Sequence, residues 1–182
     1  NVIPNGVDMN KFMPIDRKYA CKKIGWDLSK KNILFASNPT RVEKNFPLAQ
    51  KAFTHMKTSD IQLHYLNSVN HKDMPNYMNA SDVVLLTSKY EGSPNVIKEA
   101  MACNRPIVST NVGDVELLIK NLKGCFITKN NSLDIANKID IILNKYSNSN
   151  GRNRIIKLRL DSENIAKRIC AIYKEINNKF IK

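Results

Sequence analysis

Two glutamates separated by seven residues, Glu91 and Glu99, lie in a segment that can carry chemistry. An ionised carboxylate only accepts hydrogen bonds, and its two oxygens suit the paired hydroxyls of a ribose or another sugar. Between the glutamates stand Ser93 and Pro94, which are favoured at a helix N-cap and at the first helical position. We therefore expect a helix from Pro94 to Cys103 with Ser93 as its N-cap.

The start of this expected helix is a candidate anion site. The first amides of a helix have no acceptor within it, and the helix dipole adds partial positive charge there. The N–H groups of Asn95 and Val96 would point at a ligand, and Gly92 would let the backbone approach that ligand closely. We expect Gly92, Ser93, Asn95 and Val96 to contact the substrate.

A second loop, residues 37–45, offers cations for a phosphate bound at this helix start. Arg41 offers a planar fork of donors and Lys44 a mobile point charge. A charge-assisted hydrogen bond contributes about 1.5–3 kcal/mol, against roughly 0.3–1 kcal/mol for a helix terminus. We therefore expect these two side chains to dominate phosphate affinity.

Five short runs typical of β-strands alternate with helical patterns, which indicates parallel βαβ units. The strands are expected at 33–36, 61–66, 83–87, 106–109 and 125–128. Besides the helix after Ser93, helices are expected at 46–56, 74–80, 115–121 and 133–144, the last with Ser132 as its N-cap. The sequence thus predicts an α/β fold with a Rossmann-like, doubly wound parallel sheet. Such sheets bind ligands beyond the carboxyl ends of their strands, where the loops of Arg41 and Glu91 both open.

The two ends of the chain lie outside this repeat. An extended segment, 1–14, leads to a short helix at 19–24, and residues 146–154 are polar and turn-rich. A last helix is expected at about 162–180. Its apolar stripe is expected to pack on the core, or to leave an exposed patch if its partner is another domain; the stripe contains Ile165, Ile169, Ile172, Tyr173 and Ile176.

Composition indicates one ordinary soluble domain, with 182 residues, 42% hydrophobic and 25% charged. No apolar run approaches the roughly 18 residues of a membrane-spanning helix, and a cytoplasmic location is expected. The four cysteines are scattered without metal-ligand spacing, which favours reduced thiols and no metal site.

The net charge of +13 attracts phosphates, nucleic acid or an anionic membrane surface. A lysine-rich and asparagine-rich composition can equally reflect an AT-rich genome. A basic nucleic-acid-binding module therefore stays open as an alternative, although the chain shows no dense Lys/Arg tract or aromatic stacking set. Charge also makes peripheral contact with the inner face of the membrane an option.

Three segments follow one another as in retaining glycosyltransferases of the GT-B fold. They are the opening V-I-P-N-G-V-D, the Arg41/Lys44 loop and the segment E-G-S-P-N-V-I-K-E-A-M-A. The chain resembles the C-terminal, donor-binding half of such an enzyme. The resemblance implies that Glu99 binds the ribose, that Glu91 contacts the donor sugar, and that Arg41 and Lys44 hold the diphosphate. Two departures are Ser37-Asn38-Pro39 where the family often has glycine, and Gly113-Asp114 where it usually has Gly-Gly.

The resemblance also implies a function. Residues 1–182 would form the donor-binding domain, with the N-terminal acceptor domain absent, so the isolated domain would transfer little. The reaction would be the metal-independent, cofactor-free, retaining transfer of a hexosyl group from a nucleotide-diphosphate sugar. Its acceptor would be a glycan or glycolipid in cell-surface polysaccharide synthesis, with no nucleic acid as partner. A sugar-nucleotide epimerase built on the same fold is a further alternative.

Overall fold

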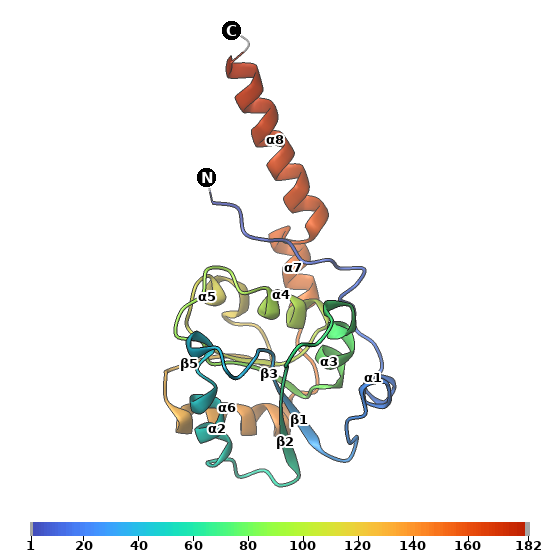
Figure 1. The fold of residues 1–182 in the computed structure, drawn as a ribbon, viewed down its shortest axis with the longest axis vertical. Helices are drawn as coiled ribbons and strands as arrows, with labels where there is room; N and C mark the ends of the chain where they lie inside the picture. Colours follow the sequence, from blue (N-terminus) through green and yellow to red (C-terminus); the bar gives the residue numbers. More distant parts are fainter. Residues whose placement is uncertain (1, 181–182) are drawn as a thin grey trace.

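The computed structural model describes residues 2–180 and shows a five-stranded parallel sheet in the order β2-β1-β3-β4-β5 (Figure 1). The strands are β1 (Lys31–Phe35), β2 (Ile61–Tyr65), β3 (Val83–Leu86), β4 (Ile107–Thr110) and β5 (Cys125–Thr128). All four residues of β3 are buried, as a central strand covered on both faces requires. The predicted Rossmann-like sheet is confirmed.

Helices cover both faces of the sheet, and alternate strand residues point to each. One face packs on α2 (Phe46–Phe53) and α6 (Ser132–Lys145), which lie below the sheet in Figure 1. The other face packs on α3 (Met74–Ala80), α4 (Asn95–Ala102), α5 (Val115–Ile119) and α7 (Gly151–Leu158). The remaining helices are α1 (Arg17–Ile24), the 3-10 turns η1 (Val42–Lys44) and η2 (His71–Asp73), and α8 (Ser162–Phe180).

The structure differs from the predictions at the starts of α6 and α7. The N-cap of α6 is Asn131 rather than Ser132, because the Asn131 side chain accepts from the amides of Leu133 and Asp134. The expected polar turn at 146–154 contains the start of α7. That helix begins at Gly151 because distant residues hold it there: the Asn104 side chain caps the Arg152 amide at 2.9 Å.

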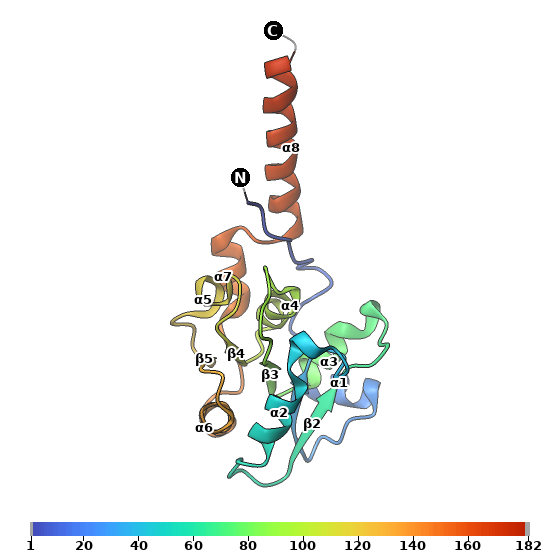
Figure 2. The ribbon, with the colours of Figure 1, turned by 60° about the vertical axis from the view of Figure 1, so that its left-hand side comes forward.

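The N-terminal segment pairs with the junction between α7 and α8. Val7 bridges Asp161 in parallel, with hydrogen bonds of 2.9 Å to Leu160 and 3.0 Å from the Ser162 amide. A Cβ on Gly6 would lie 2.7 Å from Cα of Ser162, so only glycine allows this approach. The start of the described chain and the start of α8 are therefore fixed side by side (Figures 1 and 2).

The last helix, α8, projects away from the sheet in both views (Figures 1 and 2). Of its apolar stripe, Ile165 is buried, whereas Ile169, Tyr173 and Ile176 are 41%, 65% and 43% exposed. The expectation of core packing was wrong for these three, and the stripe forms the exposed patch that was the alternative. Within residues 2–180, no helix combines the length and the apolar composition needed to cross a bilayer.

Candidate functional site

The order of the sheet reverses between β1 and β3, so the loops after these two strands open at the edge where sheets of this kind bind ligands. There the structure brings Lys44 and Glu91 together, with 2.5 Å between Nζ and Oε1. The Ser88 hydroxyl donates to the same carboxylate oxygen at 2.6 Å. The loops are joined by the Lys89 amide, which donates to the Glu43 carbonyl at 2.9 Å. The carboxylate and the ammonium are thus held at the edge where a ligand of such a sheet binds.

Arg41, the other predicted phosphate ligand, is turned to its own loop. Its Nη2 lies 2.5 Å from Oε1 of Glu43, and its side chain is 57% exposed. The pKa of Glu43 is lowered first by a hydrogen bond from the backbone amide of Glu43 itself, and then by the Arg41 guanidinium. The structure therefore does not bring Arg41 together with Glu91, and a phosphate would compete with Glu43 for it.

The start of α4 differs in one residue from the expectation. Pro94, with φ −68° and ψ 116°, is the N-cap, and the helix begins at Asn95. Ser93 is not the N-cap, because its hydroxyl donates to Oδ2 of Asp114 at 2.5 Å and accepts from Nζ of Lys98 at 2.9 Å. The amides of Asn95 and Val96 are the first two of the helix and have no acceptor within it.

Glu99, in the second turn of α4, is only 8% exposed. Its Oε1 lies 3.1 Å from Nε2 of His71, and Nδ1 of that ring lies 2.6 Å from Nζ of Lys11. An ammonium has no lone pair, so Nδ1 accepts and Nε2 donates to the carboxylate. One oxygen of Glu99 is thereby held in place. Sequence reasoning gave His71 and Lys11 no role, since nothing in their spacing relates them to a glutamate on another element.

Beside Glu99 lies a cavity of about 230 Å³ that brings together the N-terminal segment, η2, α4 and α8. Glu99 and Asn95 line it, together with Lys11, Phe12, His71 and Ser162. Glu91 does not line this cavity, because its carboxylate is turned to Lys44 and Ser88. In this structure the two carboxylates therefore belong to two separate polar centres, Glu91 with Lys44 and Ser88, and Glu99 with His71.

Lys98 connects the loop at Ser93 to the N-terminal segment. It is fully buried, and its Nζ donates to the Asn5 carbonyl at 2.7 Å as well as to Ser93. Burial lowers the pKa of Lys98, while the nearby Asp114 and Glu99 carboxylates raise it. A buried ammonium beside two carboxylates had no signal in the sequence, where Lys98 resembles any solvated lysine of a basic chain.

Gly92 is clamped by the loop after β4. The Asp114 amide donates to the Gly92 carbonyl at 3.1 Å, and a Cβ on Gly113, whose φ is +55°, would lie 2.0 Å from that oxygen. A Cβ on Gly92 itself would meet open space, which leaves its outer side free for a ligand. Among residues 2–180, no three His, Cys, Asp or Glu side chains are grouped so that they could hold a metal ion.

The parallel sheet, the reversal of its strand order and the paired loops define a Rossmann-like domain of the GT-B type. Residues 60–158 match the family described as glycosyl transferases group 1, and the chain belongs to that family.

Similar proteins agree with this assignment. The chain is 29% identical to the Escherichia coli UDP-Gal:alpha-D-GlcNAc-diphosphoundecaprenol alpha-1,3-galactosyltransferase, over 93% of this chain and 51% of that protein. Sucrose-phosphate synthase from Thermosynechococcus elongatus has the same fold, with a TM-score of 0.87, 19% identity, and coverage of 98% of this chain and 53% of that one. Anabaena Alr3699/HepE, solved in complex with UDP-glucose, has a TM-score of 0.77 and 20% sequence identity. The match covers 96% of this chain and 57% of that one. The chain thus spans about half the length of these relatives.

Proposed function

We propose that this chain is the donor-binding domain of a retaining, metal-independent hexosyltransferase that uses a nucleotide-diphosphate sugar. The observation that carries the proposal is the contact of Lys44 with Glu91 at the reversal of strand order, 2.5 Å between Nζ and Oε1. A sugar diphosphate needs a cation for its phosphates beside an acceptor for its sugar hydroxyls. This pair offers both at one edge of the sheet.

The proposed roles follow from the contacts of each side chain. Glu99 binds the ribose hydroxyls through its free oxygen, while His71 holds the other. An ammonium has three donors, so Lys44 can hold Glu91 and a phosphate oxygen together. Glu91 then contacts the donor sugar, and Arg41 joins Lys44 on the diphosphate when it leaves Glu43.

Transfer then needs no base from this chain. As the bond between the sugar and the diphosphate breaks, negative charge grows on the leaving phosphate, and Lys44 and Arg41 stabilise it most at that stage. Gly92, Ser93 and the amides of Asn95 and Val96 line the approach to the donor. In this scheme the acceptor hydroxyl enters on the face that the diphosphate leaves.

The acceptor is proposed to be a glycan or glycolipid of cell-surface polysaccharide synthesis. The name of the E. coli relative specifies an acceptor sugar linked through a diphosphate to undecaprenol. We extend that class, a sugar on a lipid diphosphate, to this chain, and with it a place in the cytoplasm at the inner face of the membrane. A second domain that holds the acceptor would complete the enzyme.

Calorimetry with UDP and UDP-glucose tests the donor site. We expect binding that persists in excess EDTA, and a loss of about tenfold to a hundredfold on Glu99→Gln, because one or more charge-assisted hydrogen bonds are removed. Glu116→Gln is the matched control, since Glu116 is exposed on α5 and pairs with Lys120. No binding at millimolar nucleotide, or equal affinity in Glu99→Gln, would contradict the site.

The alternatives predict different results. A nucleic-acid-binding module would bind an oligonucleotide tightly, with a steep loss of affinity in salt and no competition from UDP-glucose. A sugar-nucleotide epimerase would convert the donor without any acceptor, which product analysis of the full-length enzyme detects.

A further inference from the structure

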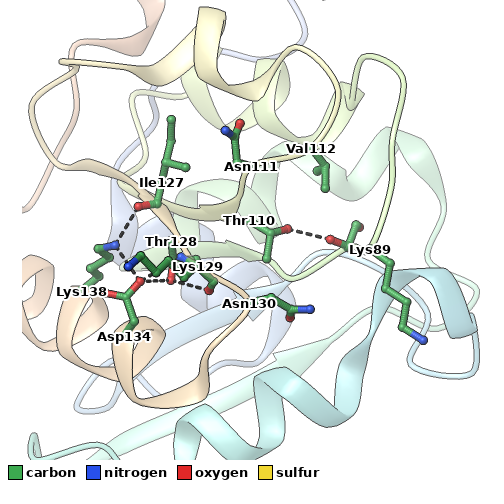
Figure 3. Close-up of a pocket in the computed structure, with 11 residues that line it drawn as sticks. Lys89, Thr110, Asn111, Val112, Ile127, Thr128, Lys129, Asn130, Asp134 and Lys138 are labelled. Atoms are coloured by element: carbon green, nitrogen blue, oxygen red, sulfur yellow. Dashed lines mark hydrogen bonds and ion pairs between the residues drawn. The ribbon is translucent and has the colours of Figure 1, made fainter.

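A pocket of about 470 Å³ at the carboxyl ends of β4 and β5 is used by none of the roles above (Figure 3). Its walls come from the loops that follow β3, β4 and β5 and from the first turns of α6. Its volume falls within the range of about 300–1,000 Å³ that small-molecule sites occupy. A single phosphate would fill only part of it, so the pocket has room for a sugar as well.

One wall of the pocket is neutral and held in place. Asp134 forms an ion pair of 2.8 Å with Lys138, and its Oδ2 also accepts from the Thr128 hydroxyl at 2.6 Å and the Lys129 amide at 2.9 Å. Lys138 donates further to the Ile127 carbonyl at 2.8 Å. The lining contains one carboxylate and three lysines, and Lys138 neutralises the charge of that carboxylate, Asp134.

The other two lysines of the pocket, Lys89 and Lys129, are uncompensated. Within residues 2–180 neither ammonium has an ion-pair or hydrogen-bond partner, and the two belong to different loops. Figure 3 shows Lys89 on the opposite side of the pocket from Asp134 and Lys138. The lining also offers the amide of Asn130 and the apolar side chain of Val112. Two uncompensated cations in one lining, an amide and an apolar surface suit a sugar that carries an anionic group.

The pocket borders the proposed donor site. Ser88 lines it, and the Ser88 hydroxyl donates to Glu91, the carboxylate proposed to contact the donor sugar. A ligand seated here therefore lies next to the sugar that is transferred. That is the position an acceptor must take, since its hydroxyl has to reach the anomeric carbon.

We propose that this pocket binds the phosphate or diphosphate ester group of the acceptor, with Lys89 and Lys129 as its cationic ligands. The inference rests on the proposed function for the identity of the acceptor, and deepens it by giving the acceptor a subsite on this domain. The two lysines neutralise the ester phosphates while the acceptor sugar extends toward Glu91.

The test titrates inorganic pyrophosphate into protein already saturated with UDP, so that the diphosphate ligands of the donor site are occupied. We expect a further binding event that weakens at least about tenfold in the Lys89→Gln/Lys129→Gln variant, because two charge-assisted hydrogen bonds are lost. UDP affinity should not change. Lys22→Gln/Lys23→Gln is the matched control, with the same charge change at exposed positions on α1.

The outcomes separate the two proposals. If the protein fails to bind UDP, the proposed donor site is contradicted. If the same protein binds pyrophosphate and this binding needs Lys89 and Lys129, the proposed pocket is supported. Absence of the second event, or equal affinity in the variant and the control, overturns the pocket. Each lysine is also replaced singly, and circular dichroism verifies the fold of every variant.

Vesicles of phosphatidylglycerol distinguish the source of the phosphate. If vesicles bind through Lys89 and Lys129 while pyrophosphate does not bind, the pocket is overturned in favour of surface adsorption to lipid. If an oligonucleotide binds through these lysines while pyrophosphate does not bind, the pocket is likewise overturned, in favour of nucleic-acid binding.

Discussion

Replacing Lys98 with methionine tests whether the buried ammonium holds the donor loop. The change keeps the length of the side chain and removes the donors to Asn5 and Ser93, at 2.7 and 2.9 Å. It also leaves the carboxylate of Asp114 without its nearby cation. Leaving two buried acceptors without their donor costs about 1–3 kcal/mol each, so Tm should fall by about 4–24 °C in a domain of this size.

Urea and thermal denaturation of four proteins measure this effect. They are the wild type, Lys98→Met, Asp114→Asn and the double variant, which form a double-mutant cycle. The double variant should regain about 1–3 kcal/mol, because the second change removes the charge that the first leaves unpaired. A Lys98→Met protein as stable as the wild type, or a cycle without coupling, would refute the reasoning.

The same residue predicts a dependence on pH. Burial lowers the pKa of Lys98 below its ordinary 10.5. Between the lowered value and 10.5, the unfolded chain keeps a proton that the folded chain has released, so the free energy of unfolding rises with pH through this group. As pH approaches 10, the free energy of unfolding of the wild type should therefore rise relative to that of Lys98→Met. A difference that is flat or falls contradicts this sign.

Three further outcomes are expected. Glu43→Gln should tighten UDP binding by up to about fivefold in calorimetry, because Glu43 no longer competes with the diphosphate for Arg41, and exposed ion pairs are weak. Gly113→Ala should destabilise by about 1–3 kcal/mol in urea denaturation and weaken UDP binding, since its Cβ would meet the Gly92 carbonyl; unchanged affinity would exclude the clamp. An aromatic disulfide reagent should modify one thiol, Cys170, in the native protein and four in urea, because burial protects the other three and raises their pKa values.

The features that local sequence dictates were predictable. Apolar runs bounded by turns gave the five strands, and the parallel direction then placed the loops of Lys44 and Glu91 at one edge. The start of α4 was predicted within one residue, since Pro94 limits where a helix can begin.

Other features depend on contacts between residues far apart in the chain, which periodicity does not encode. Ser93 has the right type for an N-cap, yet it bonds Asp114 and Lys98 because the fold brings a carboxylate and an ammonium to its hydroxyl. His71 reaches Glu99 from another element, and α7 begins where Asn104 caps it. In each case tertiary partners decided between local options that the sequence left open.

The contact between Gly6 and Ser162 has a mechanical consequence. Both residues line the cavity beside Glu99, and their backbones already touch without slack. From Ser162, α8 runs uninterrupted for 19 residues, roughly 28 Å at 1.5 Å per residue. Because Ser162 is both the first residue of this helix and part of the cavity wall, one continuous rigid element connects the outer turns of α8 to the surroundings of the Glu99 carboxylate.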